Sequence, residues 1–139
     1  MQNTFKKTLL ATAAASLIAG AAHADIKVGV ILGFTGPIES LTPAMADSAE
    51  LAFDEASNSG LLLGGDSIVS VRGDSTCVDA AAATAAAERL VNSDGVVAIM
   101  GADCSGVTGA IAKNVGAPNG VAMISPSATS PGLTSIDDN

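Results

Sequence analysis

Runs of consecutive apolar residues alternate along the chain with longer segments in which apolar residues recur at helical spacing. The first run, at 26–32, is continuous and rich in β-branched residues, which is typical of a strand buried on both faces of a sheet. Three shorter runs of the same kind predict three further strands. These strands are expected at 68–71, 96–100 and 121–124.

The segment after the first strand carries the signals of an amphipathic helix. Thr42 is a predicted N-cap, and Pro43 then occupies the first helical position, where its fixed φ is favourable. Ser59 and Gly60 mark the predicted end. The apolar stripe of this helix is expected to consist of Met45, Ala49, Leu51, Ala52, Phe53 and Ala56.

Two more helices are predicted between the later strands. The segment 78–92 is rich in alanine, the residue with the highest helix propensity, and Asp79 in its first turn complements the helix dipole. The turn Ser93-Asp94-Gly95 is expected to end it. The segment 105–115 is the third predicted helix. Its apolar side is formed by Val107, Ala110, Ile111 and Val115.

The predicted elements follow the order β-α-β-α-β-α-β with short connections. Strict alternation of this kind is typical of parallel strands joined by right-handed crossovers, with helices covering both faces of the sheet. We therefore expect an α/β fold built on a parallel sheet.

The N-terminus predicts export. Two lysines precede an apolar run over residues 9–20, and Ala22-His23-Ala24 gives the small-x-small pattern at which a signal peptidase cuts. The run is shorter than the roughly 20 residues that cross a membrane. We expect a signal peptide over 1–24, cleavage after Ala24, and a mature chain that begins at Asp25, is exported and is not embedded in the membrane.

The net charge of the mature chain argues against nucleic acids and anionic membranes as partners. Lys27, Arg72, Arg89 and Lys113 stand against 14 acidic residues, a net charge of 4 − 14 = −10. Nucleic acids and anionic membranes need a cationic face on the protein that binds them. We therefore expect a small-molecule ligand and no nucleic acid.

Composition also disfavours catalysis. The one histidine, His23, lies in the predicted signal peptide, and the chain has no Tyr or Trp. A Ser-His-Asp triad and a histidine metal site are thereby excluded, and two cysteines do not complete a four-ligand zinc site. We expect a binding protein that is not an enzyme, without a cofactor or metal.

Candidate binding residues gather in the loops that follow the four strands. In an open parallel sheet, ligands bind at the carboxyl ends of the strands. Ser105 opens the third helix, where a hydroxyl and free N–H groups suit an anionic group, although Ser105 could equally serve as the cap of that helix. Ser127 and Thr129 are expected to face it. The four loops lie at 33–37, 73–77, 101–105 and 125–131.

The glycines after the first strand only partly match a dinucleotide fingerprint. Gly29, Gly33 and Gly36 give G-x3-G-x2-G in place of G-x-G-x-x-G. The fingerprint also needs an acid at the end of the second strand, whereas Asp74 is expected to lie beyond that end. The pattern favours a simple strand-to-helix turn.

Two cysteines, Cys77 and Cys104, fall in the loops after the second and third strands. In an exported protein, such a pair is most simply a disulfide. A reactive thiol is the alternative, but no His or nearby Lys is available to lower its pKa.

Three motifs together resemble a known family. They are the D-I-K-V-G-V-x-L-x-x-T-G-P start at Asp25, G-A-D-C-S at 101–105 and I-S-P-S-A-T-S-P at 124–131. They resemble the periplasmic substrate-binding proteins of branched-chain amino acid ABC transporters, which have the type I periplasmic binding protein fold. The resemblance implies a two-lobed periplasmic protein, monomeric when complete, that captures an amino acid or a similar amide or carboxylate and delivers it to an ABC permease.

The resemblance also assigns residues. Cys77 and Cys104 match the disulfide of the family, and Leu41 stands where leucine-binding members have a tyrosine. Ligand contacts are implied for Ser105, Ser127, Ala128 and Thr129, and for Leu41 beside the side chain of the ligand. Residues 25–139 are expected to be the N-terminal part of the first lobe. A ligand-sensing ectodomain of the same fold and a secreted Rossmann-like nucleotide-dependent enzyme stay open as alternatives.

Overall fold

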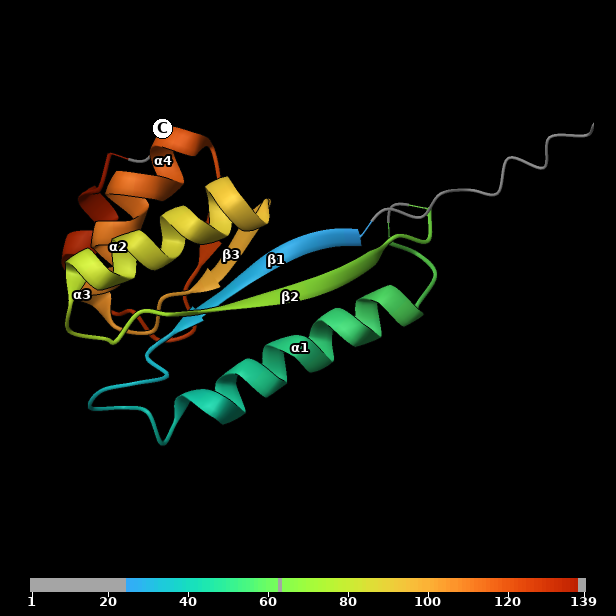
Figure 1. The fold of residues 1–139 in the computed structure, drawn as a ribbon, viewed down its shortest axis with the longest axis horizontal. Helices are drawn as coiled ribbons and strands as arrows, with labels where there is room; N and C mark the ends of the chain where they lie inside the picture. The colour runs from blue at the N-terminus through green and yellow to red at the C-terminus, as the bar shows by residue number, and fades with distance from the viewer. Residues whose placement is uncertain (1–24, 63, 138–139) are drawn as a thin grey trace, which may run out of the picture.

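The structure, a computed structural model, describes residues 25–62 and 64–137, and the predicted alternation of strands and helices is present in it (Figure 1). The predicted signal peptide lies outside the described residues. The strands are β1 (Asp25–Leu32), β2 (Ser67–Asp74), β3 (Ala98–Gly101) and β4 (Ala122–Ile124). The α-helices are α1 (Thr42–Asn58), α2 (Ala80–Glu88), α3 (Ser105–Ile111) and α4 (Ala117–Asn119).

The four strands form one parallel sheet in the order β2-β1-β3-β4. The strand β1 is central, and its Val30 lies opposite Arg72 of β2 and Met100 of β3. All four strands therefore end at the same edge, as their parallel crossovers require.

Helices cover both faces of the sheet, as predicted: α1 packs on one face, and α2, α3 and α4 lie on the other (Figure 1). Because successive strand residues point to opposite faces, Ile31 belongs to the core beneath α2 and α3. Val30 and Leu32 pack with Ala46 of α1 in a second core. None of Val30, Ile31 and Leu32 is exposed to solvent. The fold class is therefore confirmed.

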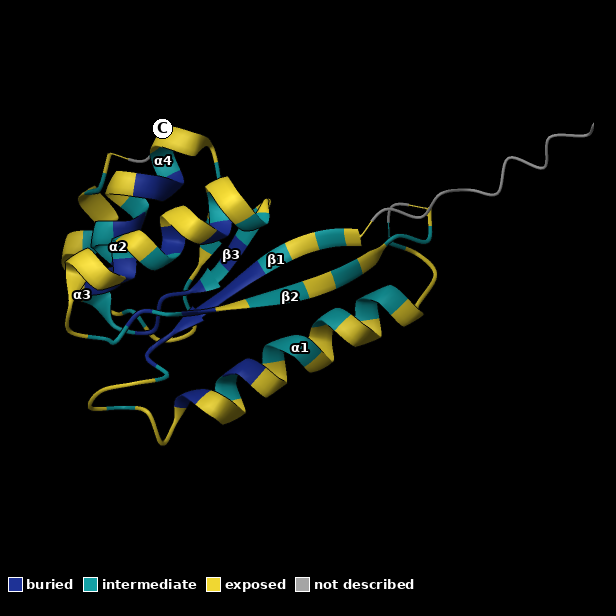
Figure 2. Cartoon of the chain, viewed as in Figure 1, coloured by how far each residue is buried: buried dark blue, intermediate teal, exposed yellow. Residues whose placement is uncertain are grey.

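Burial of β1 is less complete than its apolar sequence predicts. Only its second half, 29–32, is buried, whereas residues 25–28 are exposed or half-buried (Figure 2). The cause is the short neighbour β3, which pairs only with residues 28–31. In contrast, β2 is longer than predicted because it pairs with β1 along all eight residues.

The first helix begins differently from the prediction. Thr42 is its first residue and is preceded by Leu41 at the N-cap, so the predicted capping role of Thr42 is wrong. The buried Thr42 hydroxyl donates instead to the carbonyl of Gly33, at 3.1 Å. This bond ties the start of α1 to the loop after β1. Leu51 and Ala52 are exposed and lie outside the apolar stripe, which Ala46 joins.

The two later helices end in wider turns. The helix α2 begins after Asp79, which is its N-cap rather than part of its first turn and accepts from the N–H groups of Ala81 and Ala82. A π-helical segment, η1 (Arg89–Asp94), extends α2 to Gly95. Another, η2 (Ala112–Gly116), joins α3 to α4, so this helical stretch continues four residues beyond the predicted 115.

Candidate functional site

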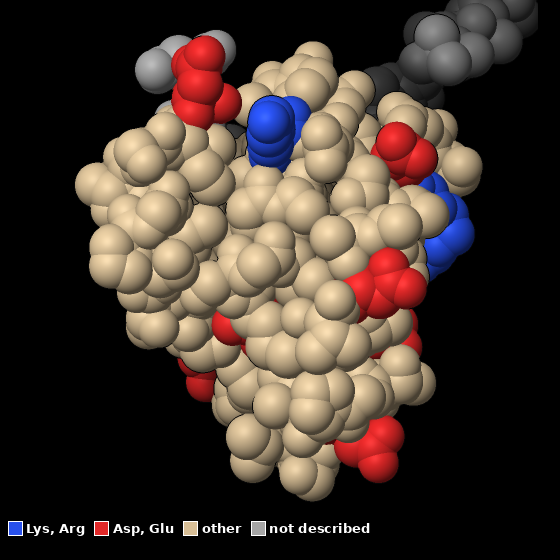
Figure 3. Space-filling view, turned by 90° about the vertical axis from the view of Figure 1, so that its left-hand side faces the viewer, with Lys and Arg blue, Asp and Glu red and all other residues tan. Residues whose placement is uncertain are grey.

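The four loops lie side by side at the carboxyl edge of the sheet. Since each loop follows its strand, the sheet order places them in the sequence 73–77, 33–37, 101–105 and 125–131. Figure 3 views the molecule from this end, and much of the surface shown there is formed by uncharged residues. The prediction that these loops meet at one edge is confirmed.

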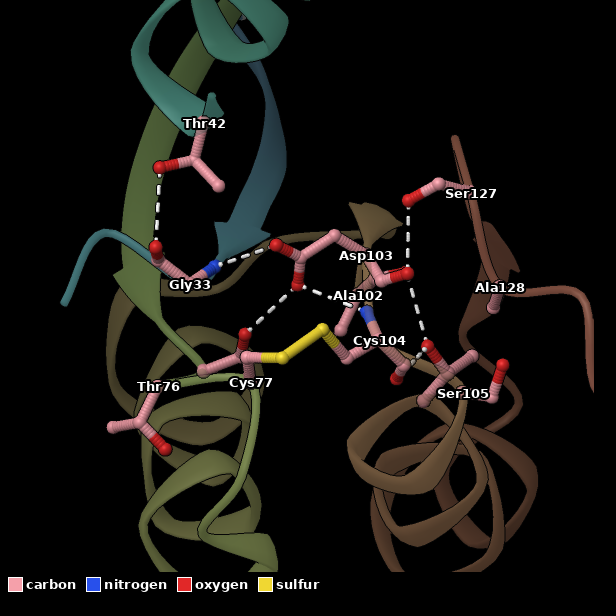
Figure 4. The surroundings of a disulfide bond; sticks show 12 residues. Gly33, Thr42, Thr76, Cys77, Ala102, Asp103, Cys104, Ser105, Ser127 and Ala128 are labelled. Atoms are coloured by element: carbon pink, nitrogen blue, oxygen red, sulfur yellow. Dashed lines mark hydrogen bonds between the residues drawn. A yellow bond between two sulfur atoms is a disulfide. The ribbon is translucent and has the colours of Figure 1, made fainter. Parts of the chain in front are cut away.

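Asp103 connects the loops to one another (Figure 4). Its side-chain Oδ2 accepts from the N–H of Gly33 at 3.0 Å, and its Oδ1 accepts from the hydroxyl of Ser75 at 3.2 Å and from the N–H of Cys104 at 3.1 Å. Its backbone carbonyl accepts from the hydroxyl of Ser127 at 2.8 Å. Asp103 is not among the residues predicted from the sequence, because an acidic residue in a loop normally lies in solvent.

The disulfide predicted from the cysteine pair is present between Cys77 and Cys104, whose Cα atoms are 5.2 Å apart. It joins the loops after β2 and β3, directly beside Asp103 (Figure 4). The alternative of a reactive thiol is wrong for this structure, because both cysteines are bonded.

Ser105 is the first residue of α3, and the N-cap is Cys104. Its hydroxyl oxygen accepts from the N–H groups of Thr129 at 3.0 Å and Ser130 at 3.1 Å, so it anchors the loop after β4 and does not cap its own helix. Within the described residues, the Ser105 proton has no acceptor. This hydroxyl can therefore still donate to an added group.

The loop after β4 is held by its own hydroxyls. Ser125 donates to the carbonyl of Ala102 and accepts from the N–H groups of Ser127 and Ala128. The Ser127 proton is engaged by Asp103, which leaves the oxygen of Ser127 as an acceptor. Among the described residues, the hydroxyl of the exposed Thr129 has no partner. The predicted residues of this loop are thus brought together with Ser105.

A second carboxylate, Asp74, links the first two loops. It is the last residue of β2, not a residue beyond the strand as predicted. Its carboxylate accepts from the hydroxyl of Thr35 at 2.6 Å, the N–H of Thr35 at 3.3 Å and the N–H of Thr76 at 2.8 Å. Burial raises the pKa of Asp74, but these hydrogen bonds outweigh it and hold the pKa below its usual value. This engaged acid does not resemble one presented to a nucleotide ribose.

Close backbone approach between the same two loops requires a glycine at position 36. Gly36 has φ +97°, and a Cβ atom built there would lie 2.5 Å from the carbonyl oxygen of Thr76. The glycine turn predicted after β1 therefore brings this loop against the loop after β2.

Basic and acidic side chains form a separate network on the α1 side of β2. Arg72 donates to Asp47 and to both carboxylate oxygens of Glu50, each at 2.7 Å. The hydrogen bonds from Arg72 lower the pKa of Glu50, and those to Glu50 and Asp47 raise the pKa of Arg72. The Arg72 guanidinium also lies over the ring of Phe34, 5.6 Å from its centre. This cation–π contact holds the loop after β1 against β2.

Leu41 is not joined to this group of hydroxyls. Leu41 is 60% exposed, and its N–H donates to the carbonyl of Ile38. A hollow of about 490 Å³ between α3, α4 and β4 includes Ser125 but not Ser105, Ser127 or Thr129. Ser127 and Thr129 are exposed and Ser105 is half-buried, so these hydroxyls lie at the surface.

Two kinds of site are not found in residues 25–62 and 64–137. No helix in these ranges is long and apolar enough to cross a membrane. No group of three or more His, Cys, Asp or Glu side chains in them is placed to hold a metal ion.

The chain is similar to a known protein family and to proteins of known type. The family model described as "Periplasmic binding protein" matches residues 25–137. The Leu/Ile/Val-binding protein BraC3 of Rhizobium johnstonii is 37% identical over 129 residues, which cover 92% of this chain and 34% of that protein.

Two solved structures share the fold. LivJ, a branched-chain amino acid transporter substrate-binding protein of Streptococcus pneumoniae in complex with isoleucine, superposes with a TM-score of 0.71 at 34% identity, over 80% of this chain and 31% of that one. An ABC transporter solute-binding protein of R. palustris in complex with benzoate gives 0.64 at 30% identity, over 76% and 28%. The chain spans about a third of the length of these relatives. It belongs to the periplasmic binding protein family, with the type I fold that its sequence predicts.

Proposed function

We propose that this chain is part of a solute-binding protein that captures an amino acid, or a similar small polar ligand, in the periplasm and delivers it to an ABC permease. The observation that carries the proposal is the convergence of the hydroxyls of Ser105, Ser127 and Thr129 at one edge of the sheet. An amino acid ligand is supported by the relatives, of which one is named a Leu/Ile/Val-binding protein and another is in complex with isoleucine.

The carboxylate of the ligand is assigned to Ser105. Because its oxygen already accepts two N–H groups, this hydroxyl is left with a proton to donate. A hydroxyl donating to a carboxylate makes a charge-assisted hydrogen bond, which is stronger than a neutral one. The hydroxyl of Thr129 is a second donor for the same group.

The ammonium of the ligand is assigned to the acceptors beside it. Ser127 donates its proton to Asp103, so its oxygen presents lone pairs. The N–H of Ala128 is engaged by Ser125, and the carbonyl of Ala128 is the second acceptor that we assign. An α-amino acid carries its carboxylate and its ammonium on the same carbon atom, so it can use these neighbouring donors and acceptors together.

The side chain of the ligand sets the range of ligands that we propose. The family resemblance implies that Leu41 lies beside the ligand side chain, where leucine-binding members have a tyrosine, and the R. palustris relative is complexed with benzoate. We therefore propose a ligand range that includes branched-chain amino acids and small amides or carboxylates. Export is proposed to follow cleavage after Ala24, and the complete protein is proposed to act as a monomer that binds without catalysis.

Thermal shift of the full-length protein tests this proposal. At a ligand concentration of about 100 Kd, binding adds roughly 2.7 kcal/mol of stability. We expect a rise in Tm with at least one of leucine, isoleucine, valine, acetamide, urea or benzoate, and none with NAD.

A pair of variants localises the binding site. Ser105→Ala is expected to reduce the thermal shift, whereas Ser48→Ala removes an exposed hydroxyl of α1 and is expected to leave it unchanged. A panel without any shift, or a shift with NAD alone, would contradict the proposal.

A further inference from the structure

We propose that Asp103 is the positioning residue of the ligand site: its buried carboxylate fixes the loops at the carboxyl edge of the sheet in the arrangement that binds a small zwitterion. The inference rests on the proposed function. It assigns to Asp103 no contact with the ligand, because its carboxylate points away from Ser127, toward Gly33 and Ser75 (Figure 4).

The donors to Asp103 come from different loops. Gly33 follows β1 and Ser75 follows β2, whereas Cys104 is next to Asp103 in the loop after β3, so the Asp103 side chain ties its own loop to two others. The fourth loop is attached through the backbone, since Ser127 donates to the carbonyl of Asp103. A neutral hydrogen bond is weaker than one to a charged acceptor, so the carboxylate holds these loops more firmly than an amide in its place.

Burial of the Asp103 carboxylate disfavours other arrangements of the loops. Asp103 is 3% exposed, and none of the ion pairs among the described residues includes it. A buried carboxylate without a cation is costly unless its oxygens are fully hydrogen-bonded. Any displacement that withdraws the N–H of Gly33 or the hydroxyl of Ser75 would leave part of this charge unsatisfied. Alternative loop arrangements are thereby disfavoured.

The loops leave little room for another arrangement. Gly33 packs so closely that a Cβ atom placed there would lie 3.3 Å from Oδ2 of Asp103 and 3.2 Å from Cβ of Cys77. Asp103 also precedes Ser105 by only two residues, across the disulfide-bonded Cys104. A shift of Asp103 would therefore move the hydroxyls of Ser105 and Ser127 together.

The substitution Asp103→Asn separates the charge from the shape of the side chain. The amide of asparagine has the same size as the carboxylate, but its nitrogen is a donor and not an acceptor. The donors around position 103 would therefore lose one of the two oxygens that accept from them. Ser75→Ala is a milder second variant, which removes one donor and leaves the carboxylate in place. Val115→Ala is the matched control, because Val115 is fully buried in the core and belongs to none of the four loops.

The test is a calorimetric titration of the full-length variants with L-leucine, L-isoleucine and benzoate, at a temperature at which each is folded. We expect Asp103→Asn to weaken binding by about tenfold or more, Ser75→Ala by a smaller factor, and Val115→Ala by less than about twofold. A merely structural role would lower Tm in all three variants without changing affinity in the folded state. Asp103→Asn or Ser75→Ala protein with unchanged affinity would overturn the proposal.

Amide hydrogen exchange without ligand gives an independent readout. We expect faster exchange at Gly33, Cys104 and the loop 125–131 in Asp103→Asn than in Val115→Ala. If the wild type binds none of the three probes, the proposed ligand class fails, while the exchange result still decides on positioning. Unchanged exchange at these amides would overturn the positioning role. Should Asp103→Asn not fold, Ser75→Ala is measured in both assays.

Discussion

Loss of the disulfide is the perturbation whose magnitude follows most directly from the structure. The bond between Cys77 and Cys104 closes a sequence separation of 27 residues and joins the segments that lead into α2 and α3. Replacing both residues by alanine frees the unfolded chain from this closed loop. On the loop-entropy model, the free energy of unfolding should fall by about 3.5 kcal/mol.

Urea denaturation followed by far-UV circular dichroism measures this loss. With a urea m-value of about 1–3 kcal/mol/M, the midpoint of the double variant should lie roughly 1.2–3.5 M below that of the wild type.

Reduced wild type serves as the control and should match the variant, whereas reductant should leave the variant unchanged. A loss below about 1 kcal/mol, or no gain of two hydrogens in the intact mass on reduction, would contradict this prediction.

Two further predictions concern the loops. Gly36→Ala should lower the free energy of unfolding by about 1–3 kcal/mol, because Gly36 has φ +97° and approaches Thr76 closely. Gly60→Ala is the control: Gly60 has φ +68° but open space around it, so the substitution should cost only the backbone strain, about 1 kcal/mol. Equal losses of stability in urea denaturation would contradict this. Because its folded pKa is lowered, Asp74 stabilises the fold above its unfolded pKa near 4, and this contribution disappears as the pH falls through the folded pKa. Asp74→Asn should therefore be less stable than wild type at pH 7, with a Tm gap that closes below about pH 4; a gap that widens on acidification would be the opposite result.

The fold was largely predictable because the apolar pattern marks both the strands and the helix faces. The order of the elements and the shared edge of the strands follow from this alternation alone. The pattern does not give strand pairing, so the eight-residue length of β2 and the exposed first half of β1 were missed. A capping residue also cannot be told from a first helical residue by its type, as Thr42 illustrates.

The site was only partly predictable. The small polar residues of the four loops indicated where ligand contacts would gather, and the compartment indicated the disulfide. The role of Asp103 could not be read from the sequence, because its partners Gly33 and Ser75 lie 70 and 28 residues away. Nor could the hydroxyl of Ser105 be assigned, since it accepts from a loop that follows it by 24 residues.

A crystal structure of the full-length protein with the ligand that gives the largest thermal shift would locate the bound ligand. We expect a ligand carboxylate oxygen within about 3.2 Å of Oγ of Ser105 and a ligand ammonium at hydrogen-bond distance from Ser127 or Ala128. A ligand bound elsewhere, with Ser105 and the loop 125–131 in contact only with solvent, would contradict it.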